Sequence, residues 1–442
     1  MKKIFLIALL FVVYGCRHSN EPTPAAPTSA VAEAWGQMTL RLMYQLPANT
    51  PTYASRALGY AGLTMYETVA AGSPVHRSLV GQLSGLNTLP QPQAGQKYNW
   101  EVALNAGQAL MLKRLFDNAD RNRLYRVDSL EYEINKPFYD SEAREVMERS
   151  VAYGKSVAEA IFEWSKTDGG FEAYKRNFDP AYVFPKGAGF WVAPLKGQVV
   201  SPYPLQPYWG KNRTFLMTND LPVPAMVAYS KEPSSDYYRG YLEVYQKSKT
   251  LTQTEREIAA WWADDPSETF SPPGHSYSLA NITVKTAQVD LFKAAETYAR
   301  VGMAVADGFV NCWKAKYTYH CERPATYVRA NIDATWEQFW PEPPFPAFYS
   351  GHSVQAAAAA TVLEDLYGKT IKITDNTHEG RLRDDIRNID YKIRSYEGFW
   401  AAAEEAALSR LYGGIHTRQD NEVGLTEGRK VGQNINQLNW KK

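Results

Sequence analysis

Apolar residues recur at helical spacing along most of the chain, with polar positions between them. The pattern predicts two helices over residues 31–71, separated by a break at 47–52 that contains Pro47 and Pro51. Strand-like alternation is scarce, so the chain is predicted to be all-α. Further helices are predicted over 101–117, 141–167, 252–263, 283–314, 352–367, 398–412 and 420–437.

The pattern divides the chain into two parts. An N-terminal helical layer is predicted over 31–250, and within it the stretch 169–233 is dense in Pro, Gly, Trp and Tyr and has no clear period. This composition predicts long ordered loops packed over the helices. A C-terminal helical bundle is predicted over 251–442. Because no Gly/Ser-rich linker separates the two parts, we expect one interlocked body.

The composition is that of a globular protein. Of 442 residues, 45% are hydrophobic and 21% are charged, so the chain can bury substantial cores. The net charge of +1 gives no global attraction to nucleic acid or to an anionic membrane. Any preference for anions must therefore come from local clustering of cations.

The N-terminus has the pattern of an export signal: a basic start, an apolar run over 4–13, and Gly15-Cys16. Gly15-Cys16 resembles the bacterial lipobox, which would make Cys16 the lipidated first residue of an exported, membrane-anchored lipoprotein facing the periplasm or the outer-membrane surface. The alternative is an ordinary signal peptide, over 1–16, that ends near a cysteine. Residues 17–30, rich in Pro, Ser, Thr and Ala, predict a flexible tether.

The remaining cysteines, Cys312 and Cys321, lie on either side of Lys316. In an oxidising exported compartment a disulfide between them would close a short loop and hold that lysine in place. The alternative is a pair of buried free thiols, because sequence spacing does not establish the bonding distance.

Three short blocks in the second half of the chain supply three cations, a hydroxyl, a glycine amide and two imidazoles. This is the set of groups that an oxyanion site requires. The second block leads directly into a predicted helix, whose N-terminal amides would point at an anion. Taken singly, each block also fits a structural role, such as a solvated cation pair or a helix cap. The blocks are Lys316 to Arg323-Pro324; Ser350-Gly351-His352; and Ser409-Arg410 with His416 and Asp420.

The third block contains a helix break at Gly413-Gly414, which is predicted to bring Arg410 and His416 together. Three neighbouring cations disfavour a further positive charge, so His416 should be neutral and nucleophilic near pH 7. Asp420 or a nearby backbone carbonyl would then accept the other ring proton and fix the tautomer.

In order and spacing, these blocks resemble the superfamily that joins vanadium-dependent haloperoxidases with type 2 phosphatidic acid phosphatases and bacterial acid phosphatases. One departure is Tyr349, where most members have Pro. The resemblance implies the helical bundle of that superfamily with an added N-terminal helical layer, and vanadate as cofactor, with phosphate or sulfate able to take its place. It implies that His416 binds vanadium or phosphorus and that His352 is the acid-base. The residues implied to hold the non-protein oxygens are Lys316, Arg323, Ser350, Gly351 and Arg410.

Trp313 and Phe345 resemble the chloroperoxidase-like branch, in which an indole and a phenyl ring line the halide side of the pocket. Asp265, which follows the Trp261-Trp262 pair, resembles the acidic residue that pairs with a site arginine in that branch. The length of the chain also fits, because simple acid phosphatases of the superfamily are much shorter.

The resemblance leaves two activities on small-molecule substrates. As a haloperoxidase, the protein would oxidise halide with hydrogen peroxide; His416 would hold vanadate, His352 would deprotonate the peroxide and Lys316 would polarise it. As a phosphatase, His416 would attack a phosphomonoester and form a phosphohistidine, while His352 would protonate the leaving alcohol. A lipid-anchored glycan-binding protein, with Trp191 or Trp209 as sugar platforms, is a third alternative that leaves the three blocks unexplained.

The other histidines are predicted to be less informative. His275 follows Pro272-Pro273-Gly274 and is predicted in a loop, while His76 and His378 lie in polar stretches. His320 lies inside the first block and would either face the pocket or pack structurally. The scattered Asp residues lack the spacing of an EF-hand, so no cation motif is predicted.

Overall fold

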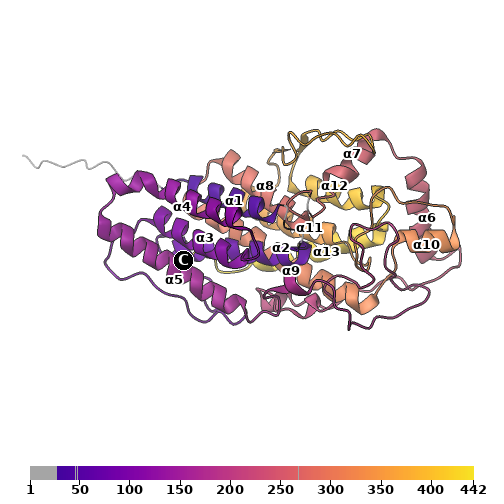
Figure 1. The fold of residues 1–442 in the computed structure, drawn as a ribbon, viewed down its shortest axis with the longest axis horizontal. Coiled ribbons are helices and arrows are strands. Elements are labelled where there is room, and N and C mark those ends of the chain that lie inside the picture. Colours follow the sequence, from indigo (N-terminus) through magenta and orange to yellow (C-terminus); the bar gives the residue numbers. More distant parts are fainter. Residues whose placement is uncertain (1–26, 45, 47, 267) are drawn as a thin grey trace, which may run out of the picture.

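The computed structural model describes residues 27–442 except 45, 47 and 267, so the predicted export signal and Cys16 lie outside the described residues. The all-α prediction is confirmed (Figure 1). Two short strands, β1 (Ile373–Asp375) and β2 (Arg394–Tyr396), pair antiparallel. The helices are α1 (Ala30–Met43), α2 (Pro51–Ala70), α3 (Trp100–Leu115), α4 (Arg121–Ser141), α5 (Arg144–Ser165), α6 (Asp236–Lys249), α7 (Gln253–Trp261), α8 (Pro272–Ala287), α9 (Leu291–Tyr319), α10 (Pro324–Asn331), α11 (Gly351–Tyr367), α12 (Phe399–Tyr412) and α13 (Arg418–Asn436).

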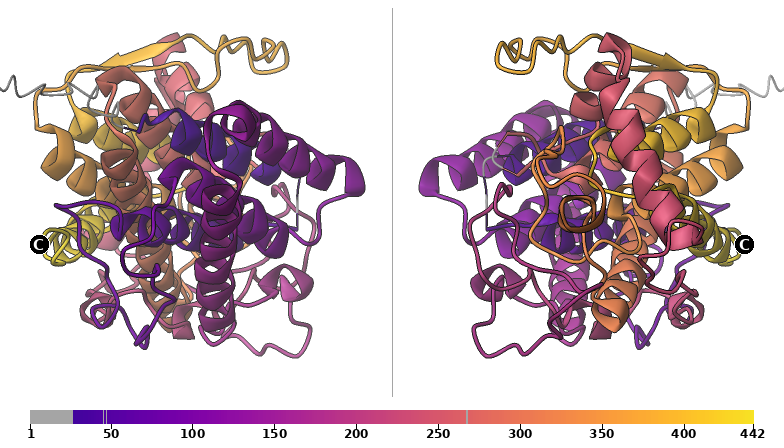
Figure 2. Two further views of the ribbon diagram at one scale, coloured as in Figure 1. Left: turned by 90° about the vertical axis from the view of Figure 1, so that its left-hand side faces the viewer. Right: turned by 90° about the vertical axis from the view of Figure 1, so that its right-hand side faces the viewer.

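The long helix α9 is the centre of the fold. It packs along α2 on one side and against α11 and α13 on the other, while α3, α4 and α5 form the opposite end of the molecule from α6 and α10 (Figures 1 and 2). Glycines at its contact with α2 let the two backbones approach closely: a Cβ added at Gly302 would lie 2.3 Å from the carbonyl oxygen of Leu58. One continuous apolar core extends from α1 to α13.

The long connection between α5 and α6 is ordered, as its aromatic composition predicted, and it contains only short 3₁₀ turns within the part that the structure describes. Asp307 of α9 anchors it, because its carboxylate accepts hydrogen bonds from the amides of Phe215 and Leu216. Trp191 and Trp209 lie in this connection and are 1% and 4% exposed. Neither indole offers a surface for a sugar, which removes the basis of the glycan-binding alternative.

The single helix predicted over 283–314 is wrong. Helix α8 ends at Ala287, Gln288 takes a left-handed φ of 49°, and α9 begins at Leu291 with the Asp290 side chain accepting the amide of Lys293. The sequence hides this break because Gln288 is neither Gly nor Pro. The loop assigned to His275 is also wrong, since the residue lies in the first turn of α8 with Pro272 at the helix start.

Three further helices within the described residues were not predicted, because they lack a long continuous apolar face. Helix α4 is mostly exposed and contains Pro137, α6 is rich in polar residues, and α10 has only 8 residues. The end of the predicted tether, residues 27–30, is ordered: Thr28 bridges Asp290, and α1 begins at Ala30. None of the helices in the described residues is both long and apolar enough to cross a bilayer.

Of the two alternatives for Cys312 and Cys321, the structure shows the pair of buried free thiols and not the disulfide. The two side chains point to different neighbours. The Cys312 thiol donates to the carbonyl of Tyr349 at 3.3 Å, whereas the sulfur of Cys321 lies 3.7 Å from the hydroxyls of Tyr237 and Tyr241. Helix α9 ends between them at His320, whose left-handed φ of 49° turns the chain away.

Candidate active site

The three sequence blocks meet where α9, α11, α12 and α13 end or begin. Hydrogen bonds to backbone carbonyls join them directly: the amide of Ser350 donates to the carbonyl of Asp420 at 3.0 Å, and Nη1 of Arg323 donates to the carbonyl of Ile415 at 2.9 Å. These bonds hold segments that are far apart in the sequence in fixed positions relative to one another. The predicted residues are Lys316 in the last turn of α9, Arg323 at the N-cap of α10, Ser350 at the N-cap of α11, Gly351 and His352 in its first turn, Arg410 in the last turn of α12, His416 between α12 and α13, and Asp420 in the first turn of α13.

Three cations are buried at this junction, since Lys316, Arg323 and Arg410 are each no more than 1% exposed. None of them forms an ion pair with a carboxylate of the described residues. Lys316 instead donates to the carbonyls of Pro346 and Ala347 at 2.9 and 2.7 Å. Burial lowers the pKa of Lys316 to about 8 and that of Arg410 to about 10, and it also lowers the pKa of Arg323. The junction thus holds three cations that nearby carboxylates such as Asp420 and Asp265 influence without forming a direct ion pair.

Two further features leave room and donors for an anion. Nη1 of Arg410 is buried and has no hydrogen-bond partner in the part of the chain that the structure describes. A Cβ added at Gly351 would meet no atom closer than 3.7 Å, and Gly351 does not have a positive φ, so neither packing nor backbone conformation demands glycine there. The absence of a side chain instead lets a ligand approach the start of α11, where Ser350 caps the helix by accepting the amide of Ser353.

The contacts of His416 assign it the predicted tautomer. Nη1 of Arg323, which can only donate, lies 3.1 Å from Nε2, so Nε2 is the acceptor and the ring proton is on Nδ1, which donates to Oδ2 of Asp420 at 2.9 Å. Burial, together with the charges of Arg323 and Lys316, holds the pKa of His416 well below its usual value. The imidazole is therefore neutral at pH 7, with its basic nitrogen directed at the cation cluster.

His352 lies on the more open side of the cluster and is only partly buried. Its Nε2 lies 3.4 Å from the carbonyl oxygen of Ala263, which orients Nε2–H toward that carbonyl and leaves Nδ1 as the basic atom. Burial and the charge of Arg410 hold the pKa of His352 well below its usual value. This imidazole is thus also neutral at pH 7 and can accept a proton.

Trp313 and Phe345 lie against the cations, as the chloroperoxidase-like pattern predicted. Their ring centroids are 4.8 Å apart, and the ammonium nitrogen of Lys316 is 5.2 Å from the Phe345 ring centroid. Phe345 also lines a cavity of about 380 Å³, together with Leu205 and Trp340. The cavity therefore lies beside the apolar edge of the cluster, and Phe345 separates it from Lys316.

Asp265 is close enough to Arg410 for each to shift the other's pKa, yet the predicted ion pair is wrong. Its carboxylate instead accepts hydrogen bonds from Gln198 and from the indole of Trp340, at 2.5 and 3.0 Å. Burial raises the pKa of Asp265 to about 7. Asp265 therefore acts on Arg410 through its charge and not through a direct ion pair.

Several site groups have no sequence signal at all. The carbonyls that hold the cations belong to residues of any type, such as Pro346 and Ile415. His320, the histidine inside the first block, faces away from the cluster and pairs with the hydroxyl of Tyr182 at 2.7 Å.

Comparisons with known proteins agree with this geometry. The family model described as the VCPO second helical-bundle domain matches residues 296–440. A crystal structure described as the first bacterial vanadium-dependent iodoperoxidase is 30% identical, with a TM-score of 0.81, over 93% of this chain and 97% of that one. The holo form of a bacterial vanadium-dependent chloroperoxidase is 15% identical, with a TM-score of 0.66 over 94% and 96% of the two chains, and shares the fold. No curated protein sequence matches. The chain belongs to the vanadium haloperoxidase superfamily.

Proposed function

We propose that this protein is a vanadate-dependent haloperoxidase that oxidises halide with hydrogen peroxide. The observation that supports it most is the cluster of Lys316, Arg323 and Arg410, three buried cations without a carboxylate ion pair in the described residues. Burying unpaired charge is costly, so a fold retains it where a bound anion completes the site. The 30% identical relative described as a vanadium-dependent iodoperoxidase supports vanadate as that anion.

The residues present fit a tetrahedral or trigonal-bipyramidal oxyanion. Nε2 of His416 would hold vanadium, the three cations and the Ser350 hydroxyl would hold the oxygens, and the unpartnered Nη1 of Arg410 would gain an acceptor. When bound, vanadate supplies a Lewis-acidic centre that activates hydrogen peroxide toward halide. Asp420 keeps His416 in the tautomer that leaves Nε2 available.

The chain's own residues supply the proton transfer and the apolar surface. His352, neutral at pH 7, accepts a proton from incoming hydrogen peroxide at Nδ1, because its Nε2–H is directed at Ala263. Lys316, charged below about pH 8, would donate a hydrogen bond to the oxidant and polarise it. Phe345, which lines the cavity, and the neighbouring Trp313 give the cluster an apolar side at which a weakly hydrated halide would bind.

The test compares purified wild type with His416→Ala, loaded with orthovanadate and given hydrogen peroxide with iodide or bromide. We expect vanadate-dependent halide oxidation in the wild type and a loss of at least about 100-fold in the variant. His320→Asn is the matched control, because Asn tolerates the positive φ at this position outside the cluster, and it should keep full activity.

Phosphatase activity is the outcome that would replace this proposal. The same wild-type protein would then release phosphate from a phosphomonoester without vanadate, His416→Ala would not, and neither would oxidise halide. Absence of both activities, in a protein that still binds vanadate, would reduce the site to an oxyanion-binding one.

We also propose that the protein is exported and anchored in a bacterial membrane through a lipid on Cys16. The support is the sequence pattern of a basic start, the apolar run 4–13 and Gly15-Cys16. Mass spectrometry of the membrane fraction should find an acylated N-terminal Cys16. A mature chain that begins elsewhere would contradict the proposal.

A further inference from the structure

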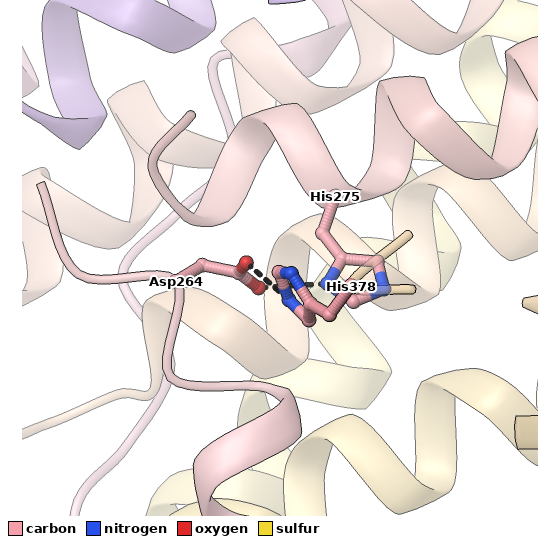
Figure 3. Close-up of side chains that lie close together, drawn as sticks. All are labelled: Asp264, His275 and His378. Carbon is pink, nitrogen blue, oxygen red and sulfur yellow. Dashed lines mark hydrogen bonds and ion pairs between the residues drawn. The ribbon is translucent and has the colours of Figure 1, made fainter. Parts of the chain in front are cut away.

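Behind the anion site lies a second buried cluster, made of Asp264, His275 and His378 (Figure 3). Asp264 follows α7, His275 lies in the first turn of α8, and His378 follows β1. Their side chains are no more than 4% exposed, and one potential ligand atom of each lies within 4.8 Å of the others. None of the three belongs to the residues that would hold vanadate.

The cluster contains a donor atom without a hydrogen-bond partner. Nε2 of His378 lies 3.0 Å from Oδ1 of Asp264, but it makes no hydrogen bond of acceptable geometry within the described residues. His378 as a whole is 5% exposed, so water does not freely satisfy this nitrogen. A buried polar atom left in this way needs another partner.

The groups around the cluster are arranged as they are around a metal-bound histidine. Nδ1 of His275 faces Oδ2 of Asp264 at 2.7 Å, while Nε2 on the far side of the ring is 2.8 Å from Oδ2 of Asp375. The indole of Trp261 donates to the same Asp375 oxygen at 2.8 Å and fixes it. A carboxylate behind the imidazole sets the tautomer and increases the basicity of the nitrogen that binds the metal.

We propose that Asp264, His275 and His378 bind one divalent transition-metal ion, with a carboxylate oxygen, Nδ1 of His275 and Nε2 of His378 as ligands. Two imidazoles and one carboxylate are the donors that ions such as Zn²⁺ prefer, whereas Mg²⁺ and Ca²⁺ prefer oxygen alone. Burial of all three residues favours a structural ion over one that turns over substrate.

The ion would join the end of α7 and the start of α8 to the excursion between β1 and β2, which reaches over one edge of the molecule in Figure 2. The two neighbours of Asp264 in the sequence interact with residues of the anion site. Ala263 orients His352 through its carbonyl, and Asp265 lies beside Arg410. The ion would therefore act as a positioning element behind the proposed active site.

The first measurement is the metal content of wild-type protein purified without chelators or a metal-affinity resin. Mass spectrometry of the elements should find about one transition-metal ion per chain besides vanadium. After removal with a chelator, the protein should take up one Zn²⁺, and Co²⁺ in its place should give the visible absorption of a site with nitrogen and oxygen ligands.

His378→Gln is the diagnostic variant, because His378 contributes the unpartnered nitrogen and Gln keeps a polar side chain of similar reach. We expect at least a tenfold loss of Zn²⁺ affinity, with His320→Asn binding Zn²⁺ like the wild type. If the variant fails to fold, the number of metal ions per wild-type chain and the Co²⁺ spectrum of the wild type still test the proposal. Equal Zn²⁺ binding by both variants, or a wild type that neither carries nor takes up a metal ion, would overturn the proposal. Either result can be told apart from the haloperoxidase test, because that test compares wild type with His416→Ala and depends on added vanadate.

Discussion

Asp420 serves both His416 and the start of α13. One oxygen, Oδ2, accepts Nδ1–H of His416 at 2.9 Å and also the backbone amide of Thr417 at 3.1 Å. We predict that Asp420→Asn lowers vanadate affinity by about 10- to 100-fold, because the amide is a weaker acceptor and no longer fixes the tautomer that leaves Nε2 available. Isothermal titration with vanadate measures the change.

The control must separate this effect from loss of the helix cap. Thr417 is the other half of the capping box, since its hydroxyl accepts the amide of Asp420 at 3.3 Å. Thr417→Ala should cost about 1 kcal/mol in the free energy of unfolding and leave vanadate affinity within about twofold of the wild type. Equal losses of affinity in both variants would assign Asp420 to the cap alone.

The pKa of Lys316 predicts how anion binding depends on pH. Burial lowers that pKa to about 8, so the side chain is charged below this pH and loses its charge as the pH rises through it. We expect the affinity for an oxyanion to fall above about pH 8. A bound anion favours the charged form, so binding in this range should take up protons.

Tungstate is a suitable probe, because it does not itself titrate from about pH 6 to about pH 10. Lys316→Arg remains charged over this range and should flatten the fall in affinity near pH 8. A wild-type dissociation constant that stays unchanged up to about pH 10 would show that another group controls the alkaline side.

The residues that carry side-chain chemistry could be found from the sequence, and the groups that orient them could not. Short blocks identify Lys316, Arg323 and His416, because their order and spacing are unusual. The backbone carbonyls that accept hydrogen bonds from those side chains can belong to any residue type, so the sequence does not reveal them. The hydrogen bond from the indole of Trp340 to Asp265 joins positions 75 residues apart and depends on the fold. The predicted pairing of Asp265 with an arginine failed for that reason.

The contact between α2 and α9 predicts a large effect from a single methyl group. A Cβ at Gly302 would lie 2.3 Å from the carbonyl oxygen of Leu58, which belongs to rigid helix backbone and has little freedom to move. We predict that Gly302→Ala lowers the free energy of unfolding by about 1–3 kcal/mol, although Ala is the better helix former. Urea denaturation monitored by circular dichroism gives the value.

Gly240 in α6 provides the opposite case. A Cβ there would meet only Thr417, at 3.9 Å, which is ordinary van der Waals contact. Gly240→Ala should therefore raise the free energy of unfolding by about 0.5–1 kcal/mol through helix propensity alone. If Gly302→Ala were stabilising as well, the two helices would not be packed as closely as described.

Helices with an apolar face were predicted well, while breaks and polar helices were not. The ends of α11 and α12 fall within about one residue of prediction, because Ser350, Gly413 and Gly414 mark them. The break between α8 and α9 was missed because Gln288 adopts a positive φ without being Gly. Proline at the start of α8 was taken as a loop signal, although it also suits the first helical turn.

The molecule as a whole carries almost no net charge, at +1, so the cation cluster is a local feature that the fold must stabilise. Burial lowers the pKa of all three cations, which means that each is less favourable in the folded protein than in the unfolded chain while it is charged. An oxyanion that binds only the folded protein offsets this cost. Its effect on stability grows with concentration as RT ln(1 + [L]/Kd).

We therefore predict that vanadate raises the stability of the wild type by about 2.7 kcal/mol at a concentration of 100 Kd. For Arg410→Met, the same vanadate concentration should give no measurable rise in the free energy of unfolding, because the variant lacks the buried Nη1 that would donate to the anion. Without anion, the variant should unfold within about 1 kcal/mol of the wild type, since a buried cation without an ion pair is replaced by an apolar chain of similar length. Denaturation curves with and without vanadate give all four values. A large loss in the anion-free variant would instead mean that the bonds of Arg410 to Ala259 and Ser409 hold α12 in place, and that the cluster stabilises the fold even before an anion binds.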